Sequence, residues 1–169
     1  MTKTYLGLGS NKGNREKTLH QTLDQISKRI GTITSHSSLY QTQPWGITEQ
    51  PDFLNLVIEV NTSLNAIELL GLVLEIEKIM GRTRHRKWYS RIIDIDVLFY
   101  GDQIIREKDL VVPHPYITQR NFVMVPLVEI AADLIHPVLK KTIKELYTDL
   151  FDPLPVRRIS PQIPFQTIN

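Results

Sequence analysis

The spacing of apolar residues alternates between strand-like and helix-like along residues 4–101, and the order of these segments limits the possible folds most. Extended segments are predicted at residues 4–9, 32–42, 53–62 and 92–101, and helices at residues 14–30 and 65–81. The order is therefore strand, helix, strand, strand, helix, strand. That order predicts an α+β fold of the ferredoxin-like type, in which an antiparallel sheet carries its helices on one face.

Local signals support these boundaries. Asn65 and Glu68 have the spacing of a capping box, and Gly81 and Gly31 lie where a C-terminal glycine would end each helix. Within residues 53–62 the apolar side chains alternate, so one side of the strand should face the core. The core side is formed by Leu54, Leu56, Ile58 and Val60.

The region after residue 101 is predicted to add a short strand, a long loop and two helices, the first of which contains Pro126. Residues 152–169 are rich in proline and are expected to wrap the surface or to fray. No linker is evident, so the whole of residues 1–169 is interpreted as one domain with C-terminal helical additions.

Composition excludes several classes of function. The formal net charge is only +2 over 169 residues, so no general affinity for nucleic acid or membranes is expected. The chain has no cysteine, which excludes disulfides, zinc–thiolate sites and thiol nucleophiles. The N-terminus lacks the pattern of a signal peptide, and a cytoplasmic location is expected.

A glycine-containing segment near the N-terminus does not predict a known nucleotide-binding loop. Gly7, Gly9 and Gly13 do not have the spacing of a dinucleotide fingerprint, and no Gly-Lys-Ser/Thr sequence follows. These glycines are interpreted as turn residues.

The last predicted strand of the pattern carries two carboxylates on one face. Asp94 and Asp96 are separated by one residue, which places them about 6.5–7 Å apart on the same side. Ile93, Ile95 and Val97 should face the core. Two carboxylates this close repel each other unless a cation lies between them. Mg²⁺ is commonly held by one or two carboxylates together with substrate phosphates. The alternative is a solvated strand face whose acids pair with nearby arginines.

A basic segment directly precedes this strand. Within residues 82–91 there are no acids and five basic residues, Arg82, Arg84, Arg86, Lys87 and Arg91. Arginine binds phosphate in a bidentate manner, and arginines beside metal-binding carboxylates are typical of phosphoryl transfer. A solvated loop is the alternative. His114 and Arg120 form a second, weaker basic group.

Four sequence blocks resemble the 6-hydroxymethyl-7,8-dihydropterin pyrophosphokinase family. In order they are residues 7–14, 40–55, 81–101 and 112–131. The resemblance covers residues 4–137 and implies a ferredoxin-like fold. It also implies transfer of a pyrophosphoryl group from ATP to the hydroxymethyl group of the pterin, with release of AMP, as a step of folate biosynthesis. Two Mg²⁺ ions, a monomeric enzyme, and no nucleic-acid or membrane partner are expected.

The resemblance further implies roles for individual residues. Asp94 and Asp96 match the family's magnesium-binding aspartates, and Arg82 and Arg91 join them as catalytic residues. The residues matching ATP ligands are Glu77, Arg84, Trp88, Arg91, His114 and Arg120. The residues matching the pterin site are Asn11, Thr42, Gln43, Trp45, Phe53, Asn55 and Phe122. A flat polar heterocycle needs aromatic faces to stack on and fixed polar groups at its edge, which suits the phenylalanines and Asn55.

Two other functions remain open on pattern alone. One is a different Mg²⁺-dependent transferase with an Asp-x-Asp motif, such as a nucleotidyl- or glycosyltransferase, which would release a different product from the nucleotide. The other is a non-enzymatic ferredoxin-like module, for example an RNA-binding one. Concentration of the basic residues in one loop argues against the second alternative.

Overall fold

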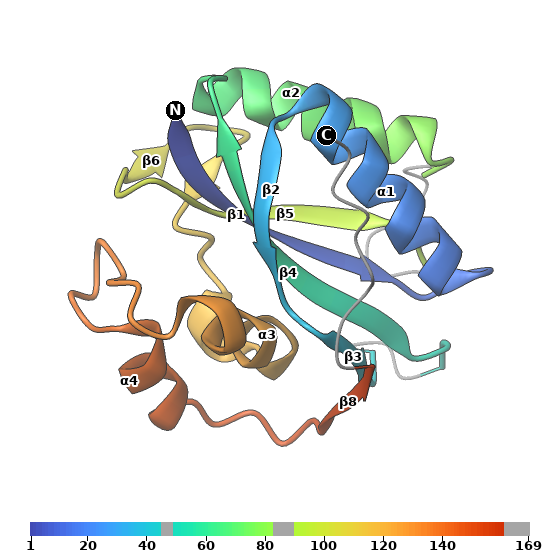
Figure 1. Ribbon diagram of the computed structural model, residues 1–169. Helices are drawn as coiled ribbons and strands as arrows, with labels where there is room; N and C mark the ends of the chain where they lie inside the picture. The colour runs from blue at the N-terminus through green and yellow to red at the C-terminus, as the bar shows by residue number, and fades with distance from the viewer. Residues whose placement is uncertain (45–48, 83–89, 161–169) are drawn as a thin grey trace.

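The computed structural model describes residues 1–44, 49–82 and 90–160 (Figure 1). Its strands are β1 (Thr2–Ser10), β2 (Thr32–His36), β3 (Leu39–Thr42), β4 (Phe53–Thr62), β5 (Asp94–Tyr100), β6 (Ile105–Arg106), β7 (Val111–Val112) and β8 (Val156–Ser160). Its helices are α1 (Arg15–Arg29), α2 (Ala66–Ile79), α3 (Asn121–Ala131) and α4 (Ile143–Thr148), with a 3₁₀ turn at Ile117–Gln119.

The main sheet confirms the predicted fold class. Its strand order is β5-β1-β4-β3-β8, with β2 also paired to β4, and every pairing is antiparallel. Residues 32–42, predicted as one strand, form two strands, β2 and β3, and both pair with β4. Ser37 marks the break, because its Oγ accepts a hydrogen bond from the Val57 amide at 3.0 Å. Strands β6 and β7 form a separate two-stranded sheet.

Helices cover both faces of the sheet, but to different extents. Figure 1 shows α1 and α2 on one face and α3 with α4 on the other. The first face packs on a buried apolar cluster that includes the strand residues Leu6, Leu8, Leu54, Leu56, Ile58, Val60, Ile95 and Val97. The predicted core side of β4 is therefore confirmed. On the opposite face, the side chains of Tyr5, Val57, Leu98 and Phe99 form a second buried cluster with residues of α3 and α4.

The ends of the first two helices test the capping predictions. Asn65 and Glu68 form a complete capping box on α2, and Gly81 follows that helix with a φ of 89°. Gly31 does not have the left-handed conformation expected of it. A Cβ at Gly31 would lie 2.1 Å from the Asn61 carbonyl oxygen, so this glycine allows the chain to pass close to β4.

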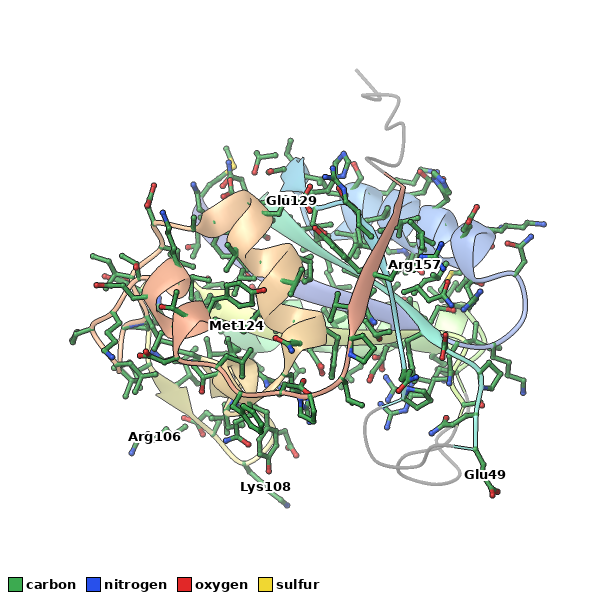
Figure 2. The ribbon with its side chains drawn as sticks, turned by 90° about the horizontal axis from the view of Figure 1, so that it is seen from below. Glu49, Arg106, Lys108, Met124, Glu129 and Arg157 are labelled. Atoms are coloured by element: carbon green, nitrogen blue, oxygen red, sulfur yellow. The ribbon has the colours of Figure 1, made fainter. Side chains whose placement is uncertain are left out.

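Helix α3 is fastened to the sheet by a carboxylate. Glu129, labelled in Figure 2, accepts hydrogen bonds from the Ser38 amide at 2.8 Å, the Ser38 hydroxyl at 2.6 Å and the Tyr40 hydroxyl at 2.9 Å. Arg158 of β8 lies 3.6 Å from the same carboxylate. Burial and the Glu129 carboxylate together raise the pKa of Tyr40 to about 12, so its hydroxyl remains a donor at neutral pH.

The proline-rich C-terminal segment is partly ordered. Residues 156–160, expected to wrap the surface or fray, form β8 and pair with β3 at the edge of the main sheet. Figure 2 shows this strand, with Arg157 labelled, running beside the sheet. None of the helices in residues 1–44, 49–82 and 90–160 has the length and apolar character required to span a membrane.

Candidate functional site

One half of the α3-side sheet face carries polar groups from three neighbouring strands. Across these strands, Asp94 of β5 is in register with Gly9 of β1, and Gly9 is in register with Asn55 of β4. Asp96 is in register with Gly7 in the adjacent row. The two aspartates and Asn55 thus lie on one surface, with only glycine between the acidic and amide groups.

The interpretation of these glycines as turn residues is wrong for two of them. Gly7 and Gly9 lie inside β1, while Gly13 has a φ of 69° and does lie in a turn. A Cβ at Gly9 would be 2.7 Å from Oδ1 of Asn55, whereas a Cβ at Gly7 would be 3.5 Å from the Leu98 side chain. Gly9 therefore makes room for the Asn55 amide.

Two arginines pair with Asp94, which is the pairing that the alternative interpretation of the Asp-x-Asp motif described. Arg82 Nη1 lies 2.5 Å from Asp94 Oδ1, and Arg91 Nη1 binds Asp94 Oδ2. Arg82 also pairs with Glu77, which is only 2% exposed and accepts a hydrogen bond from the Ile95 amide at 2.9 Å. This acid of α2 therefore ties the start of β5 to the arginine that follows α2.

The second aspartate has an unusual proton affinity. Burial raises the pKa of Asp96 to about 7, and the Asp94 carboxylate adds to that rise. The cationic side chains of Arg120 and Arg91 oppose it. Because ionisation of buried Asp96 beside a second carboxylate is costly, a cation bound at this surface would be strongly favoured.

The residues ahead of α3 bring a second basic group to the same place. Arg120 stacks over the Tyr116 ring at 4.8 Å and the Phe122 ring at 5.6 Å. The His114 ring packs against Tyr116 with 5.9 Å between centroids. Burial, with help from the Arg120 charge, lowers the pKa of His114 to about 4, so the ring is neutral at pH 7.

Tyr116 is a member of this group that sequence reasoning did not single out. Its position two residues from His114 and four from Arg120 was the available signal, because an aromatic side chain beside phosphate-binding candidates is suited to stack on a guanidinium.

Two of the predicted pterin-binding residues, Phe53 and Asn55, lie on β4, across β1 from the aspartates of β5. Asn55 is 6% exposed and donates from Nδ2 to Oγ1 of Thr42 at 2.7 Å, so its Oδ1 is held beside Gly9. Phe53 starts β4 two residues earlier and is half-buried, and Gln43 is exposed just beyond β3. Phe122 lies in the first turn of α3, under Arg120.

Asn11 forms a connection between loops. Its Nδ2 donates to Gln50 Oε1 at 3.1 Å and to the Pro51 carbonyl at 3.2 Å. Its Oδ1 accepts a hydrogen bond from the Arg91 amide at 2.7 Å, and its own amide donates to the Arg91 carbonyl at 3.1 Å. The side chain, which is 1% exposed, thereby joins the Arg91 segment to the loop before β4.

Three of the predicted site residues, Trp45, Arg84 and Trp88, lie outside the residues that the structure describes. Their expected roles stay predictions.

The donor set fits a hard divalent cation. Within residues 1–44, 49–82 and 90–160 there is no cluster of three or more acidic, histidine or cysteine side chains suited to a metal. The protein therefore offers the Asp94–Asp96 pair, and remaining ligands would come from water or phosphate, which is the pattern typical of Mg²⁺. Because both oxygens of Asp94 contact arginines, a bound cation would require one of those contacts to rearrange.

Comparisons with known proteins agree with this geometry. Residues 5–132 match the family model described as 7,8-dihydro-6-hydroxymethylpterin-pyrophosphokinase (HPPK). A protein of Aquifex aeolicus named 2-amino-4-hydroxy-6-hydroxymethyldihydropteridine pyrophosphokinase is 41% identical over 145 residues, which cover 86% of this chain and 90% of that protein. A Methylorubrum extorquens protein of the same name is 40% identical over 160 residues, covering 94% of this chain and 99% of the relative.

A solved structure supports the fold independently. The crystal structure of Plasmodium falciparum HPPK-DHPS has a TM-score of 0.71 at 22% identity, and the match covers 88% of this chain. This chain corresponds to only 43% of that longer one, so the likeness concerns the fold of the shared part.

Proposed function

The chain belongs to the 7,8-dihydro-6-hydroxymethylpterin-pyrophosphokinase family, and on that premise we propose a role for each group of the site. The protein is an enzyme that transfers pyrophosphate from ATP to the hydroxymethyl group of 6-hydroxymethyl-7,8-dihydropterin in folate biosynthesis. The products of that transfer are AMP and the pterin diphosphate.

We propose that Asp94 and Asp96 hold Mg²⁺, two ions when ATP is bound. When bound, Mg²⁺ neutralises phosphate charge and favours ionisation of the attacking hydroxyl. Support comes from the shared face of the two carboxylates and from the raised pKa of Asp96. Arg82 and Arg91 pair with Asp94, and both become available to bind the transferred phosphates when a cation occupies that carboxylate.

We propose that His114 and Arg120 bind further phosphate oxygens of ATP. Arg120 keeps its charge and is oriented by the Tyr116 and Phe122 rings, so it can donate to an anion without first being ordered. His114 is neutral at pH 7 and supplies a hydrogen bond rather than a charge. Glu77 contributes by positioning Arg82. Arg84 and Trp88 are proposed as additional ATP ligands by resemblance alone.

We propose that the pterin stacks between Phe53 and Phe122 and that the Asn55 amide forms hydrogen bonds with polar atoms at the edge of the ring. Asn55 has a fixed orientation because Thr42 Oγ1 accepts a hydrogen bond from its Nδ2. Its Oδ1 then lies over Gly9, which has no side chain to cover it. By resemblance alone, we propose that the backbone of Thr42, Gln43 and Trp45 also contacts the pterin. Asn11, whose side chain is engaged by both loops, would act on the pterin by holding those loops in place.

The in-line reaction needs no protein nucleophile. The hydroxymethyl oxygen attacks the β-phosphorus of ATP, the bond from that phosphorus to the α-phosphate oxygen breaks, and AMP leaves. The single observation that carries this assignment of roles is the convergence of Arg82 and Arg91 on Asp94 beside Asp96. We further propose that the enzyme acts as a monomer, because one chain supplies the aspartate, the arginines and the Asn55 amide of the site. We also propose a cytoplasmic location.

A product assay tests the proposal. The protein is incubated with Mg²⁺, ATP and 6-hydroxymethyl-7,8-dihydropterin, and the nucleotides are separated. AMP formed in equal amount with the pterin diphosphate is expected. The Asp96→Asn variant should lose several orders of magnitude in turnover while keeping the fold, as judged by circular dichroism. ADP as the product, or near-normal activity of that variant, would contradict the assignment.

A further inference from the structure

The segment that leads to β8 passes the beginning of α3 and bonds to it. Asp152 Oδ2 accepts a hydrogen bond from the Asn121 amide at 2.9 Å, and the Asn121 side chain donates to the Asp152 carbonyl at 2.7 Å. The other carboxylate oxygen, Oδ1, accepts from the Leu154 amide at 3.0 Å. Asp152 therefore fixes the start of α3 with one oxygen and the turn of its own segment with the other.

Helix α3 needs such an external partner. The residue at its N-cap position is Arg120, which makes no side-chain capping bond to the helix. The first amides of a helix have no partner within it, so an acceptor from elsewhere stabilises them. Asp152, 31 positions away in sequence, supplies that acceptor, and its negative charge is favourable at a helix N-terminus.

The capped residue lies between two residues of the site. Arg120 and Phe122 flank Asn121 directly, and the Arg120 guanidinium lies over the Phe122 ring. A change in the backbone at Asn121 therefore reorients both side chains together. One is proposed to bind phosphate and the other to stack on the pterin.

The same segment also reaches the opposite side of the pterin site. Four residues after Asp152, Val156 begins β8 and is in register with Thr42 of β3. Thr42 in turn accepts the hydrogen bond that orients Asn55. Residues 152–156, here called the C-terminal strap, thus connect the helix that carries Phe122 to the strand that supports Asn55.

We infer that Asp152 is a positioning residue for substrate binding, acting through the Asn121 amide to fix Arg120 and Phe122. This inference rests on the proposed function, because it assigns the two flanking residues to ATP and pterin. Asp152 itself touches neither substrate. The proline-rich C-terminal segment, in which no role was found by sequence reasoning, thereby becomes part of the binding site's support.

A purely stabilising role predicts something different. A cap that only stabilised the fold would, when removed, lower the unfolding temperature and leave the kinetics of the folded enzyme unchanged. A positioning role predicts weaker substrate binding at temperatures where the variant is fully folded. The two roles are separable by measuring binding and thermal unfolding on the same protein.

The test compares three variants of the full chain. Asp152→Ala removes both acceptor oxygens, and Asp152→Asn keeps one oxygen, which caps a helix about as well as aspartate. Asp149→Ala is the matched control, because it removes the same charge from an exposed carboxylate. Within the described part of the chain, the Asp149 side chain pairs with exposed Lys141 alone. Affinities for the pterin and for Mg²⁺–ATP are measured by calorimetry, and kcat and KM by the product assay.

For Asp152→Ala we expect kcat/KM for the pterin to fall about tenfold, the size of effect that loss of a helix cap permits. Its pterin affinity should fall by a similar factor. Asp152→Asn should recover most of this loss, and Asp149→Ala should match the wild type. Faster hydrogen exchange at the Asn121 amide in Asp152→Ala should accompany the loss.

Unchanged affinities for both substrates in folded Asp152→Ala would overturn the inference, as would an equal loss in Asp149→Ala. An equal loss in Asp152→Asn would overturn the role of the oxygen acceptor. Failure of the proposed function has a different signature, namely no pterin-dependent AMP from the wild-type enzyme. In that case the calorimetric affinities still decide whether Asp152 affects ligand binding.

Discussion

Replacing Gly9 with alanine should impair pterin use without unfolding the protein. A Cβ at this position would lie 2.7 Å from Asn55 Oδ1 and 3.6 Å from Phe53 Cδ1. The first distance is shorter than any stable contact allows, so something must move. The strand backbone is paired on both sides, to β4 and to β5, and therefore the Asn55 side chain is the group that rotates away.

The cost to the fold should be small. Rotation of Asn55 breaks its 2.7 Å hydrogen bond to Thr42, and a typical intramolecular hydrogen bond contributes ~0.5–1.5 kcal/mol to stability. Restricting the unfolded chain by a glycine-to-alanine change offsets part of this, by ~0.4–1 kcal/mol. The effect on catalysis should be larger. A displaced amide leaves the polar edge of the pterin without a hydrogen-bond partner, which costs ~1–3 kcal/mol and lowers kcat/KM for the pterin by about 5- to 150-fold.

The product assay with varied pterin concentration measures this loss, and Gly7→Ala is the matched control. Gly7 lies on the same face of the same strand, but its added Cβ would make only a 3.5 Å contact with the Leu98 side chain. A double variant with Asn55→Ala identifies the route of the effect, since Gly9→Ala should cost little once Asn55 is gone. Wild-type kcat/KM in Gly9→Ala, or an equal loss in Gly7→Ala, would refute the reasoning.

Two further predictions concern charge and loop connections. Because burial and Asp94 raise the pKa of Asp96 from 3.8 to about 7, the metal-free protein should lose stability relative to Asp96→Asn as the pH rises from 4 to 8. Thermal unfolding in EDTA checks this, and equal pH dependence of the two proteins would contradict it. Asn11→Ala removes the bonds to Gln50 and to the Arg91 amide, and should lower kcat/KM for both substrates about tenfold or more. A loss confined to one substrate would show that the loops are not coupled through this side chain.

Much of the fold follows from local pattern. The alternation in β4 and the capping box of Asn65 and Glu68 depend on neighbours in sequence, and both are confirmed. The glycines show the limit of such reasoning. Gly31 and Gly9 are required by contacts with Asn61 and Asn55 on β4, and nothing near them in sequence records those contacts.

The site shows the same division. That Asp94 and Asp96 share a face follows from the period of a strand. The ion pairs of Asp94 with Arg82 and Arg91 correspond to the alternative drawn from the same sequence, and phosphate binding by these arginines stays a prediction. Tyr116 was not singled out, because its contact with the Arg120 guanidinium depends on how the chain between them folds. Asp152 could not be found at all, since a lone acid in a proline-rich segment has no periodicity and its partner is 31 residues away.

The distribution of supports around the site has a physical reason. On the α1–α2 side, an unbroken apolar layer fixes the sheet by close packing. On the opposite side, α3 covers only part of the sheet, and a surface that must admit two polar substrates cannot be held by apolar contacts alone. On that side, hydrogen bonds hold the elements in place. Glu129 accepts from Tyr40 of β3, Asp152 accepts from the first amide of α3, and Asn11 accepts from the Arg91 amide. The Asn11 bond ends at Arg91, a proposed ligand, and the Asp152 bond ends at Asn121, directly between two proposed ligands, so the loss of either should weaken binding before it unfolds the chain.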